Sequence, residues 1–302
     1  MPNEMGSWPD QDPQQLQLPT VLPRLPLGGQ QISTPITKNI YTIGEFIGEG
    51  SFGYVYACTD LWNNELAAKI LKPDGDRQLV QGNAIREYQR LFALRHPYIT
   101  YVFDMFEFQE LSYIITERCW WSVTRLINEL AGFNGAVWLM PIARCILQAV
   151  DFIHSNGVVH KDIHPGNVFV NAQKSELVTD GRVNFNFKLG DLGISALVSE
   201  LQPGHGPFAN WIFPPEVMDP VQFGPIDHRV DLYHCGLLLL QILSGKLLKF
   251  SHNDILAGVP RQLALQLPMP FSAAIEKTLR RHTMFRTESA KELWRDLNSP
   301  VA

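Results

Sequence analysis

The sequence is short of cysteine, and it has no excess of charge of either sign. Its four cysteines (Cys58, Cys119, Cys145 and Cys235) form no CxxC pair, which argues against a disulfide scaffold or a structural zinc site and is typical of a reducing compartment. Charged residues make up 18% of the 302, and 25 Lys and Arg stand against 30 Asp and Glu. No basic field therefore favours nucleic acid or an anionic membrane. The hydrophobic fraction of 45% is normal for a globular protein and argues against a wholly disordered chain.

Long apolar runs are also lacking. Met1-Pro-Asn-Glu begins neither a basic nor an apolar stretch, so we see no secretory signal. The most apolar run, Cys235 to Leu243, is interrupted by Gln241 and is shorter than the roughly 20 residues that a membrane helix needs. We expect this run to be a buried core helix. We also expect a cytoplasmic protein with neither a membrane nor a nucleic acid as partner.

Residues 1–40 differ in composition from the rest of the chain. They hold seven of the 21 prolines and six glutamines, and their apolar residues follow no helical or strand period. Such a segment buries too little apolar surface to offset the entropy of ordering it. We expect a disordered tail that acts as a plain linker, with a proline-rich docking segment as the alternative.

From Tyr41 to residue 117 the pattern favours strands. Residues 41–70 alternate in polarity and are rich in β-branched and aromatic types, and Gly48–Gly53 and Trp62-Asn-Asn separate them into three antiparallel strands. Two further strands are predicted at 100–108 and 111–117, and apolar residues at helical spacing predict a helix over 78–95.

After about residue 120 the pattern becomes mainly helical. A helix is predicted over Val137–Ser155, because it carries one apolar stripe and is followed by Asn156-Gly157, a C-cap signal. Short strands at 158–160, 167–170 and 185–190 precede further helices from about residue 230. The chain is therefore predicted to be an α+β protein with a strand-rich N-terminal lobe and a helix-rich C-terminal lobe.

A glycine-rich run, Gly48-Glu-Gly-Ser-Phe-Gly53-Tyr-Val55, lies between two of the predicted strands. Glycines let backbone N–H groups approach phosphate oxygens closely, and Val55 could cover an adenine ring. The strand–loop–strand setting disfavours the dinucleotide fold, which needs a helix after the loop.

Lys69 lies on the third predicted strand, 21 positions after Gly48. Glu87 shares the helical stripe of Ala84 and Leu91, so its carboxylate points inward and needs a counter-charge that Lys69 could supply. The alternative interpretations are a lysine that extends to solvent and a solvated glutamate on the helix surface.

Two polar loops follow in the C-terminal half. In Val159-His-Lys-Asp162-Ile-His-Pro-Gly-Asn167, an aspartate precedes by five positions an asparagine that enters an apolar strand. This spacing places a proton acceptor and a metal-binding amide in one loop. Leu189-Gly-Asp191-Leu-Gly193 then places a second carboxylate at the end of a strand.

In this order, the motifs resemble a eukaryotic-type protein kinase catalytic domain over about Tyr41 to Leu297. Pro214-Pro-Glu216, the segment from Asp231 to Gly236, and Arg286 as the expected partner of Glu216 extend the resemblance. The resemblance implies a bilobal kinase-like fold over 41–302, with an N-lobe at 41–118 and a C-lobe at 119–302.

The resemblance also implies ATP and Mg²⁺ as cofactors. Asp162 would accept the substrate proton, Lys69 oriented by Glu87 would hold the α- and β-phosphates, and Asn167 and Asp191 would bind magnesium. His164 takes the place of the family's lysine that touches the γ-phosphate, and we count it among the catalytic residues. The implied nucleotide-binding residues are Ile47, Gly48, Gly50, Gly53, Val55, Ala67, Lys69, Thr116 as gatekeeper, Glu117, Cys119 and Phe169.

The sequence departs from the family pattern in several places. The departures are Lys161 for arginine, His164 for lysine, Ala209 for threonine, Leu192 for phenylalanine, and a long Asn167-to-Asp191 interval that we interpret as an extended hairpin over 172–184. Asp162-Ile-His-Pro-Gly-Asn is similar to the corresponding loop of small-molecule phosphotransferases. Between Asp191 and Glu216 the only hydroxyls are Ser195 and Ser199, so we favour activity without activation-loop phosphorylation over a switch that uses Lys161.

We therefore expect a protein serine/threonine kinase. Two alternatives stay open: a small-molecule phosphotransferase, favoured by His164 and Ala209, and a pseudokinase that acts as a binding scaffold. The presence of Lys69, Asp162, Asn167 and Asp191 argues against the scaffold. The sequence identifies neither the physiological substrate nor the oligomeric state.

Overall fold

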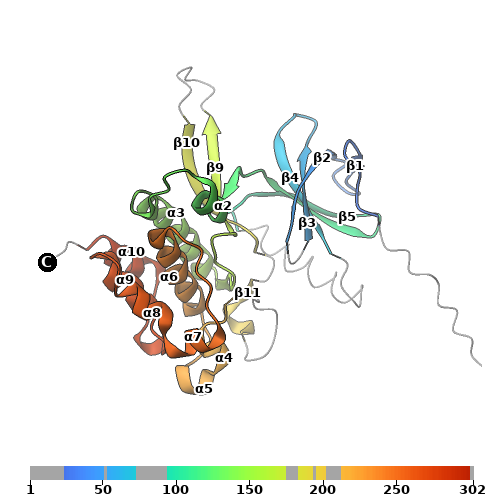
Figure 1. Ribbon diagram of the computed structural model, residues 1–302. Coiled ribbons are helices and arrows are strands. Elements are labelled where there is room, and N and C mark those ends of the chain that lie inside the picture. The colour runs from blue at the N-terminus through green and yellow to red at the C-terminus, as the bar shows by residue number, and fades with distance from the viewer. Residues whose placement is uncertain are drawn as a thin grey trace, which may run out of the picture.

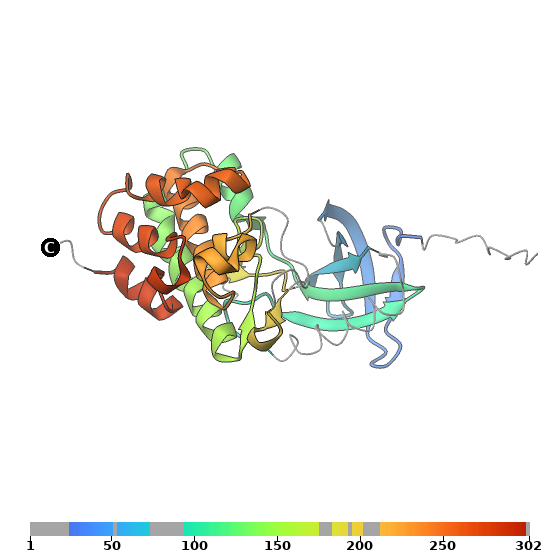
Figure 2. The ribbon, with the colours of Figure 1, turned by 90° about the horizontal axis from the view of Figure 1, so that it is seen from below.

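The computed structural model describes residues 24–50, 53–72, 94–174, 183–192, 195–201 and 212–299. They form two lobes, one built mainly of strands and the other mainly of helices (Figures 1 and 2). Each lobe has its own cluster of buried apolar side chains. The bilobal α+β architecture predicted from the sequence is confirmed.

The N-lobe contains a six-stranded antiparallel sheet in the order β1-β2-β3-β4-β6-β5. Its strands are β1 (Gln31–Ser33), β2 (Ile40–Glu49), β3 (Gly53–Thr59), β4 (Glu65–Leu71), β5 (Val102–Phe108) and β6 (Leu111–Glu117). In β4, Leu66, Ala68 and Ile70 are buried and the residues between them are not. This alternation arises because one face of the strand packs on the lobe's core. All five strands predicted between Tyr41 and residue 117 are present.

β1 lies within the segment that was expected to be disordered, and that expectation is wrong for residues 24–40. Ile32 of β1 pairs with Tyr41 of β2 and is completely buried. Three side chains also donate hydrogen bonds to Oδ2 of Asp104 on β5: Thr37, Asn39 and Tyr41. The strand escaped prediction because one buried residue between two exposed ones shows no period. Residues 1–23 lie outside the described residues.

The helix predicted over 78–95 also lies outside the described residues, apart from Leu94 and Arg95. Glu87, the predicted partner of Lys69, belongs to this part of the chain.

The C-lobe is built around two buried helices, α3 and α6. Its helices are α2 (Val123–Glu129), α3 (Gly135–Ser155), α4 (Pro215–Met218), α5 (Pro220–Phe223), α6 (Arg229–Ser244), α7 (His252–Ala257), α8 (Val259–Ala264), α9 (Phe271–Thr278) and α10 (Ala290–Leu297), with 3₁₀ turns η1 (Val198–Glu200) and η2 (Thr283–Phe285). α3 begins two residues earlier than predicted, because the Asn134 side chain accepts the N–H of Ala136 and caps the helix. A Cβ on Gly135 would lie 2.0 Å from the Ile242 carbonyl oxygen, so glycine lets α3 approach α6 closely.

α3 is also long and apolar enough to cross a membrane, judged by length and composition alone. Ten of its residues are buried, however, and it packs against α6, α10 and β10. We therefore assign it as a core helix of the lobe. α6 contains the run Cys235–Leu243 and is buried from Val230 to Ile242, which confirms the core helix predicted there.

Two small sheets complete the C-lobe: β10-β9-β7 and β11-β8. Their strands are β7 (Trp121–Ser122), β8 (Val158–Val159), β9 (Val168–Lys174), β10 (Val183–Leu189) and β11 (Ala196–Leu197). β9 and β10 form a long hairpin that extends away from the helices (Figure 1). At its base Val168 pairs with Leu189, so the chain returns from β9 and β10 to one place. The loops that hold Asn167 and Asp191 therefore lie side by side despite their long separation in sequence.

Candidate functional site

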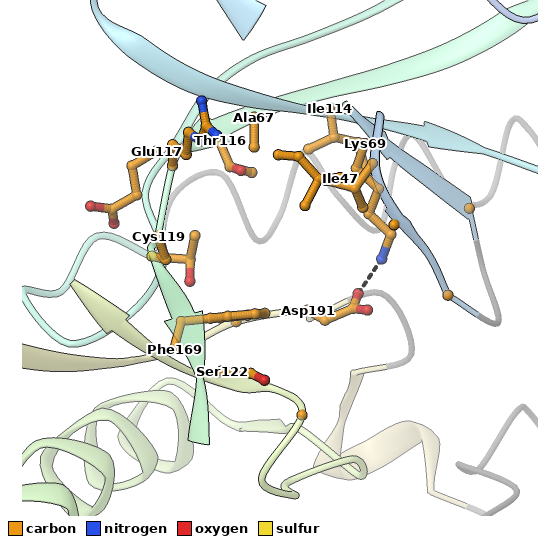
Figure 3. Close-up of a pocket in the computed structure, with 18 of the residues that line it drawn as sticks. Ile47, Ala67, Lys69, Ile114, Thr116, Glu117, Cys119, Ser122, Phe169 and Asp191 are labelled. Atoms are coloured by element: carbon orange, nitrogen blue, oxygen red, sulfur yellow. Dashed lines mark hydrogen bonds and ion pairs between the residues drawn. The ribbon is translucent and has the colours of Figure 1, made fainter. Parts of the chain in front are cut away.

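A cavity of about 540 Å³ lies between the two lobes. It is lined by every residue that the resemblance assigns to nucleotide binding: Ile47, Gly48, Gly50, Gly53, Val55, Ala67, Lys69, Thr116, Glu117, Cys119 and Phe169. Figure 3 shows Ala67 and Ile47 on one side of this cavity and Phe169 on the opposite side. A flat apolar group the size of a purine would fit between these two sides.

The glycine-rich segment covers one end of the cavity. A Cβ at residue 53 would lie 2.4 Å from the carbonyl oxygen of Ile70, so only glycine lets β3 pair with β4 there. Gly50 donates a backbone hydrogen bond of 2.9 Å to the Gly53 carbonyl and tightens the turn. Ser51 and Phe52 at the tip lie outside the described residues.

Lys69 reaches from β4 across the cavity to Asp191. Its Nζ lies 2.5 Å from Oδ1 of Asp191, and the two side chains are 17% and 26% exposed (Figure 3). Asp191 has φ of 57°, a left-handed conformation that is uncommon outside glycine. The structure thus places a cation and a carboxylate, predicted from separate motifs, in one ion pair.

The segment that joins the lobes after β6 is anchored by the side chain of Glu117. Its Oε1 accepts hydrogen bonds from the Tyr101 amide at 2.7 Å and the Lys188 Nζ at 2.6 Å, and its Oε2 accepts one from Asn171 at 3.0 Å. The backbone amides of Glu117 and Trp120 are occupied by the carbonyls of Tyr101 and Val170. An adenine edge would therefore have to use backbone groups between these two amides.

Cys119 lies in this joining segment and faces the cavity (Figure 3). Burial raises the pKa of the Cys119 thiol to about 12, and the nearby Glu117 carboxylate adds to the effect. The thiol is therefore protonated at neutral pH and is a poor nucleophile.

Asp231 at the start of α6 shapes the polar loop 160–167. Its Oδ2 accepts the amide of His160 and its Oδ1 accepts the amide of Lys161, each at 2.8 Å, and the His154 ring bonds Oδ2 at the same distance. Burial by itself would raise the pKa of Asp231, but these bonds lower it, so the carboxylate is charged. Asp231 therefore anchors the backbone of this loop to the start of α6.

Within the loop, hydrogen bonds join the side chain of Asn167 to Asp162. The Asn167 amide nitrogen donates to the main-chain oxygen of Asp162 at 3.0 Å and to its Oδ2 at 2.9 Å. Oδ1 of Asp162 is buried, and it accepts no hydrogen bond from the residues that the structure describes. This oxygen lies 3.5 Å from Nε2 of His164, and a carboxylate oxygen can accept a further hydrogen bond.

His164 lies next to Asp162, with its Nε2 3.5 Å from Oδ1 of the aspartate. Burial by itself would raise the pKa of Asp162, but the imidazole contact and the nearby His160 and His234 rings lower it below the ordinary value. Asp162 is thus ionised at neutral pH, the state that a proton acceptor needs.

The donor set at this site fits magnesium better than a transition metal. No group of three or more His, Cys, Asp or Glu side chains that could hold a metal occurs in the described ranges. Asn167 uses its amide nitrogen twice on Asp162, which leaves its carbonyl oxygen for a cation, and Asp191 offers a carboxylate. Mg²⁺ binds through one or two protein oxygens together with waters and phosphates. Asn167 and Asp191 could therefore hold it, as the sequence predicted.

The C-lobe contains a buried ion pair between Arg286 and Glu216. Arg286 and Glu216 are completely buried and joined by two bonds, of 2.5 Å and 2.8 Å, as the sequence predicted.

The two serines between Asp191 and Glu216 differ in exposure. Ser195 is buried and donates a 2.6 Å bond to the Leu192 carbonyl, whereas Ser199 is exposed. Phosphorylation of the folded protein in this segment therefore has Ser199 as its accessible target. Ala209 lies outside the described residues.

Several residues that line the cavity were not singled out as site residues from the sequence. They are Glu49, Ile99, Thr100, Val102, Ile114, Arg118, Trp120, Trp121, Ser122, Arg125, Gly166, Leu189, Gly190 and Leu192. Ser122 could have been found as the cap of α2, because its Oγ accepts the Arg125 amide. Most of the others are apolar residues whose sequence pattern reports only burial. Asp162, His164 and Asn167 lie beside the cavity in the polar loop.

Comparison with known proteins agrees with this geometry. The family model described as "Protein kinase domain" matches residues 41–298. Cyclin-dependent kinase D-1 of Arabidopsis thaliana is 26% identical over 222 residues, which cover 71% of this chain and 52% of the relative.

Two bacterial proteins are similar over more of the chain. A probable serine/threonine-protein kinase of Clostridium acetobutylicum is 25% identical over 279 residues, 87% of this chain and 40% of its own. Serine/threonine-protein kinase PknB of Mycobacterium tuberculosis is 27% identical over 276 residues, 85% of this chain and 42% of its own. The chain thus spans about half the length, or less, of these curated relatives.

Proposed function

The chain belongs to the protein kinase domain family, and from this premise we propose that it is an ATP- and magnesium-dependent kinase that phosphorylates serine and threonine hydroxyls of a protein. The observation that carries the proposal is the polar loop beside the cavity. Asp162 is ionised, is fixed by Asn167, and has a buried oxygen that accepts no hydrogen bond from the described residues.

The roles of the side chains follow from their positions. The acceptor hydroxyl oxygen would attack the γ-phosphorus while the bond to the bridging oxygen of ADP breaks, and Asp162 would take the hydroxyl proton. Lys69 would hold the α- and β-phosphates, and Asn167 and Asp191 would hold magnesium. The metal, when bound, supplies neutralisation of the phosphate charge. The glycine segment and the joining segment would fix the nucleotide, so positioning contributes much of the rate.

Two sets of buried interactions in the C-lobe favour a protein acceptor over a small molecule. Glu216 and Arg286 form a fully buried pair, and Asp231 holds the loop by its backbone. Glu216, Arg286 and the segment from Asp231 to Gly236 are the residues that extend the resemblance to protein kinases into this lobe. The relatives whose names identify them as serine/threonine kinases support the same choice.

His164 is the observation that favours the second candidate, a small-molecule phosphotransferase. Its ring lies at the catalytic aspartate, where the protein kinase pattern has lysine. A pseudokinase scaffold is the third candidate, and the ionised Asp162 and the Lys69–Asp191 pair argue against it.

The acceptor class can be tested with radiolabelled ATP and the full chain. We expect label on generic protein substrates, phosphoserine and phosphothreonine on hydrolysis, and no label on a panel of sugars, aminoglycosides and choline. Lys69→Met should abolish the transfer, whereas Lys249→Met, on an exposed lysine of the C-lobe, should not. Label confined to the metabolite panel would replace the protein acceptor by the small-molecule one.

A further inference from the structure

The backbone of Gly166 contacts the side chain of His164, two residues before it in the loop. The Gly166 backbone N–H donates a 3.0 Å hydrogen bond to Nδ1 of the His164 ring. Because an N–H donates this bond, Nδ1 accepts it and carries no proton. The proton of the neutral ring is then on Nε2, the nitrogen that lies 3.5 Å from Oδ1 of Asp162.

The same local geometry recurs four residues earlier in the loop. The Asp162 amide donates to Nδ1 of His160 at 3.2 Å, and Nε2 of His160 lies 3.0 Å from the Gly190 carbonyl oxygen. Since a carbonyl can only accept, His160 carries its proton on Nε2. In each case an amide two residues along fixes the tautomer of the ring.

Gly166 also leaves the space that the His164 ring occupies. A Cβ at residue 166 would lie 2.6 Å from Cε1 and 2.9 Å from Nδ1 of His164, and 3.7 Å from Oγ1 of Thr124. Gly166 does not have a positive φ, so an alanine would meet the ring and not backbone strain. The ring would have to turn away, and its Nε2 would leave Asp162.

From these contacts we infer that Gly166 is a positioning residue that, by its amide and its missing Cβ, holds the His164 imidazole as the Nε2–H tautomer facing Asp162. This inference rests on the proposed function, because it assigns the pair to the orientation of the proton acceptor. The orientation of the His164 ring depends on glycine at position 166, and the positioning role of Gly166 depends on histidine at position 164.

The test is a double-mutant cycle on the full chain. We expect Gly166→Ala and His164→Ala each to lower kcat by about 10²-fold, because small displacements at a reacting centre have effects of this size. KM for ATP should change by less than about threefold, since neither residue is among those assigned to nucleotide binding and the effect acts through the orientation of His164 toward Asp162. The double variant should lose no more than the worse single variant. Losses that multiply would show two independent residues and would overturn the inference.

A second background separates this role from a general effect on folding. In His164→Lys, which restores the family's residue, Gly166→Ala should change kcat by less than about threefold, because the ring that it displaces is gone. Gly28→Ala, where the nearest atom would be the Gly44 oxygen at 3.6 Å, is the matched control and should leave activity unchanged. A full 10²-fold loss from Gly166→Ala in the lysine background would contradict the inference.

The tautomer itself can be measured without any activity. In ¹⁵N-histidine NMR spectra, the signals of His164 are identified among the nine histidines by their loss in His164→Ala. We expect Nδ1 to be unprotonated and Nε2 to be protonated in the wild type, and this pattern to change in Gly166→Ala. A protonated Nδ1 in the wild type would overturn the inference. If no acceptor is phosphorylated in any assay, the proposed function falls, and the NMR result still decides the tautomer.

Discussion

At the scale of single residues, two non-glycine residues of the site have strained left-handed backbone conformations, and each is held by a bond to another residue. Lys161 and Asp191 have φ of 67° and 57°, conformations that cost about 1–3 kcal/mol each outside glycine. The amide of Lys161 is held by Oδ1 of Asp231, and Asp191 is held by Lys69. The strain therefore lies in the two loops to which we assign the proposed chemistry.

The pair of Glu216 and Arg286 leads to a stability prediction. The arginine also donates to the carbonyls of Arg280, Arg229 and Arg281, so its loss would leave a buried charge and three acceptors. We expect Arg286→Met to lower the free energy of unfolding by about 3–5 kcal/mol. Replacing both partners, as Glu216→Leu with Arg286→Met, should cost less than the single change. Urea unfolding measures both variants, and a double variant that is less stable than Arg286→Met would contradict this prediction.

His234 makes stability depend on pH. Burial lowers the pKa of His234 below its ordinary 6.5, because this side chain of α6 is buried in the C-lobe and burial disfavours the charged ring. Below pH 6.5 the unfolded chain binds a proton at this residue that the native state does not, so the contribution is lost as pH falls. We expect His234→Gln to remove up to about 1.4 kcal/mol per pH unit from the slope of stability between pH 6.5 and 5.5.

The matched control for that slope is His252→Gln, because His252 is exposed at the start of α7. Urea unfolding at pH 7.5, 6.5, 6.0 and 5.5 measures the slopes. A slope that is equal in the wild type and His234→Gln would count against a neutral buried ring.

At the scale of elements, the predictable features are those in which local pattern and burial agree. In β2 and β4 buried residues alternate with less buried ones, and α3 carries one buried stripe, so periodicity predicted these elements. β1 was missed because three residues carry no period. A hairpin is predicted over 172–184, of which residues 175–182 lie outside the described part of the chain. The described strands β9 and β10 pair as a hairpin requires, and their pairing at the base brings Asn167 and Asp191 together.

The contribution of β1 can be measured by truncation. We expect a chain that begins at residue 41 to melt about 5 °C or more below one that begins at residue 24, because it loses the burial of Ile32 and the bonds to Asp104. The chain from residue 24 is the matched control for removal of residues 1–23. Differential scanning calorimetry measures both, and equal melting temperatures would contradict a structural role for β1.

Much of the candidate site could be predicted because its residues belong to ordered motifs. Lys69 and Asp191 were found separately, and the fold placed them 2.5 Å apart. The partners of Glu117 could not be predicted, since Asn171 and Lys188 lie 54 and 71 residues away and only tertiary structure joins them. Gly166 is local to His164, but the conflict of a Cβ with the ring depends on a rotamer that the sequence does not specify.

At the scale of the whole molecule, two sets of hydrogen bonds join the lobes next to the cavity. In the first, Glu117 at the end of β6 bonds Lys188 and Asn171 of the C-lobe hairpin. In the second, the segment before β5 pairs with the end of β10, where the Thr100 amide bonds the Leu189 carbonyl and the Leu189 amide bonds the carbonyl of Tyr98. The Tyr101 amide, which bonds Glu117, links the two sets.

Lys188→Met tests the first of these connections. The change leaves the Glu117 carboxylate, which is 17% exposed, without this counter-charge. We expect a loss of about 1–3 kcal/mol in stability and a higher KM for ATP, because the joining segment becomes less well fixed. Lys277→Met, which removes the bonds of Lys277 to Glu292 and Asp296 within the C-lobe, is the control for loss of a lysine that forms ion pairs. An unchanged KM would contradict the role of Glu117 in fixing the joining segment.

The central claim is that Asp162 accepts a proton during phosphoryl transfer from ATP. The most direct test measures magnesium-dependent transfer of the γ-phosphate by the full chain, wild type beside Asp162→Asn, with folding checked by circular dichroism. We predict transfer by the wild type, none after chelation of magnesium, and a decrease of about 10²-fold or more in the variant. Equal transfer by the wild type and Asp162→Asn would contradict the claim.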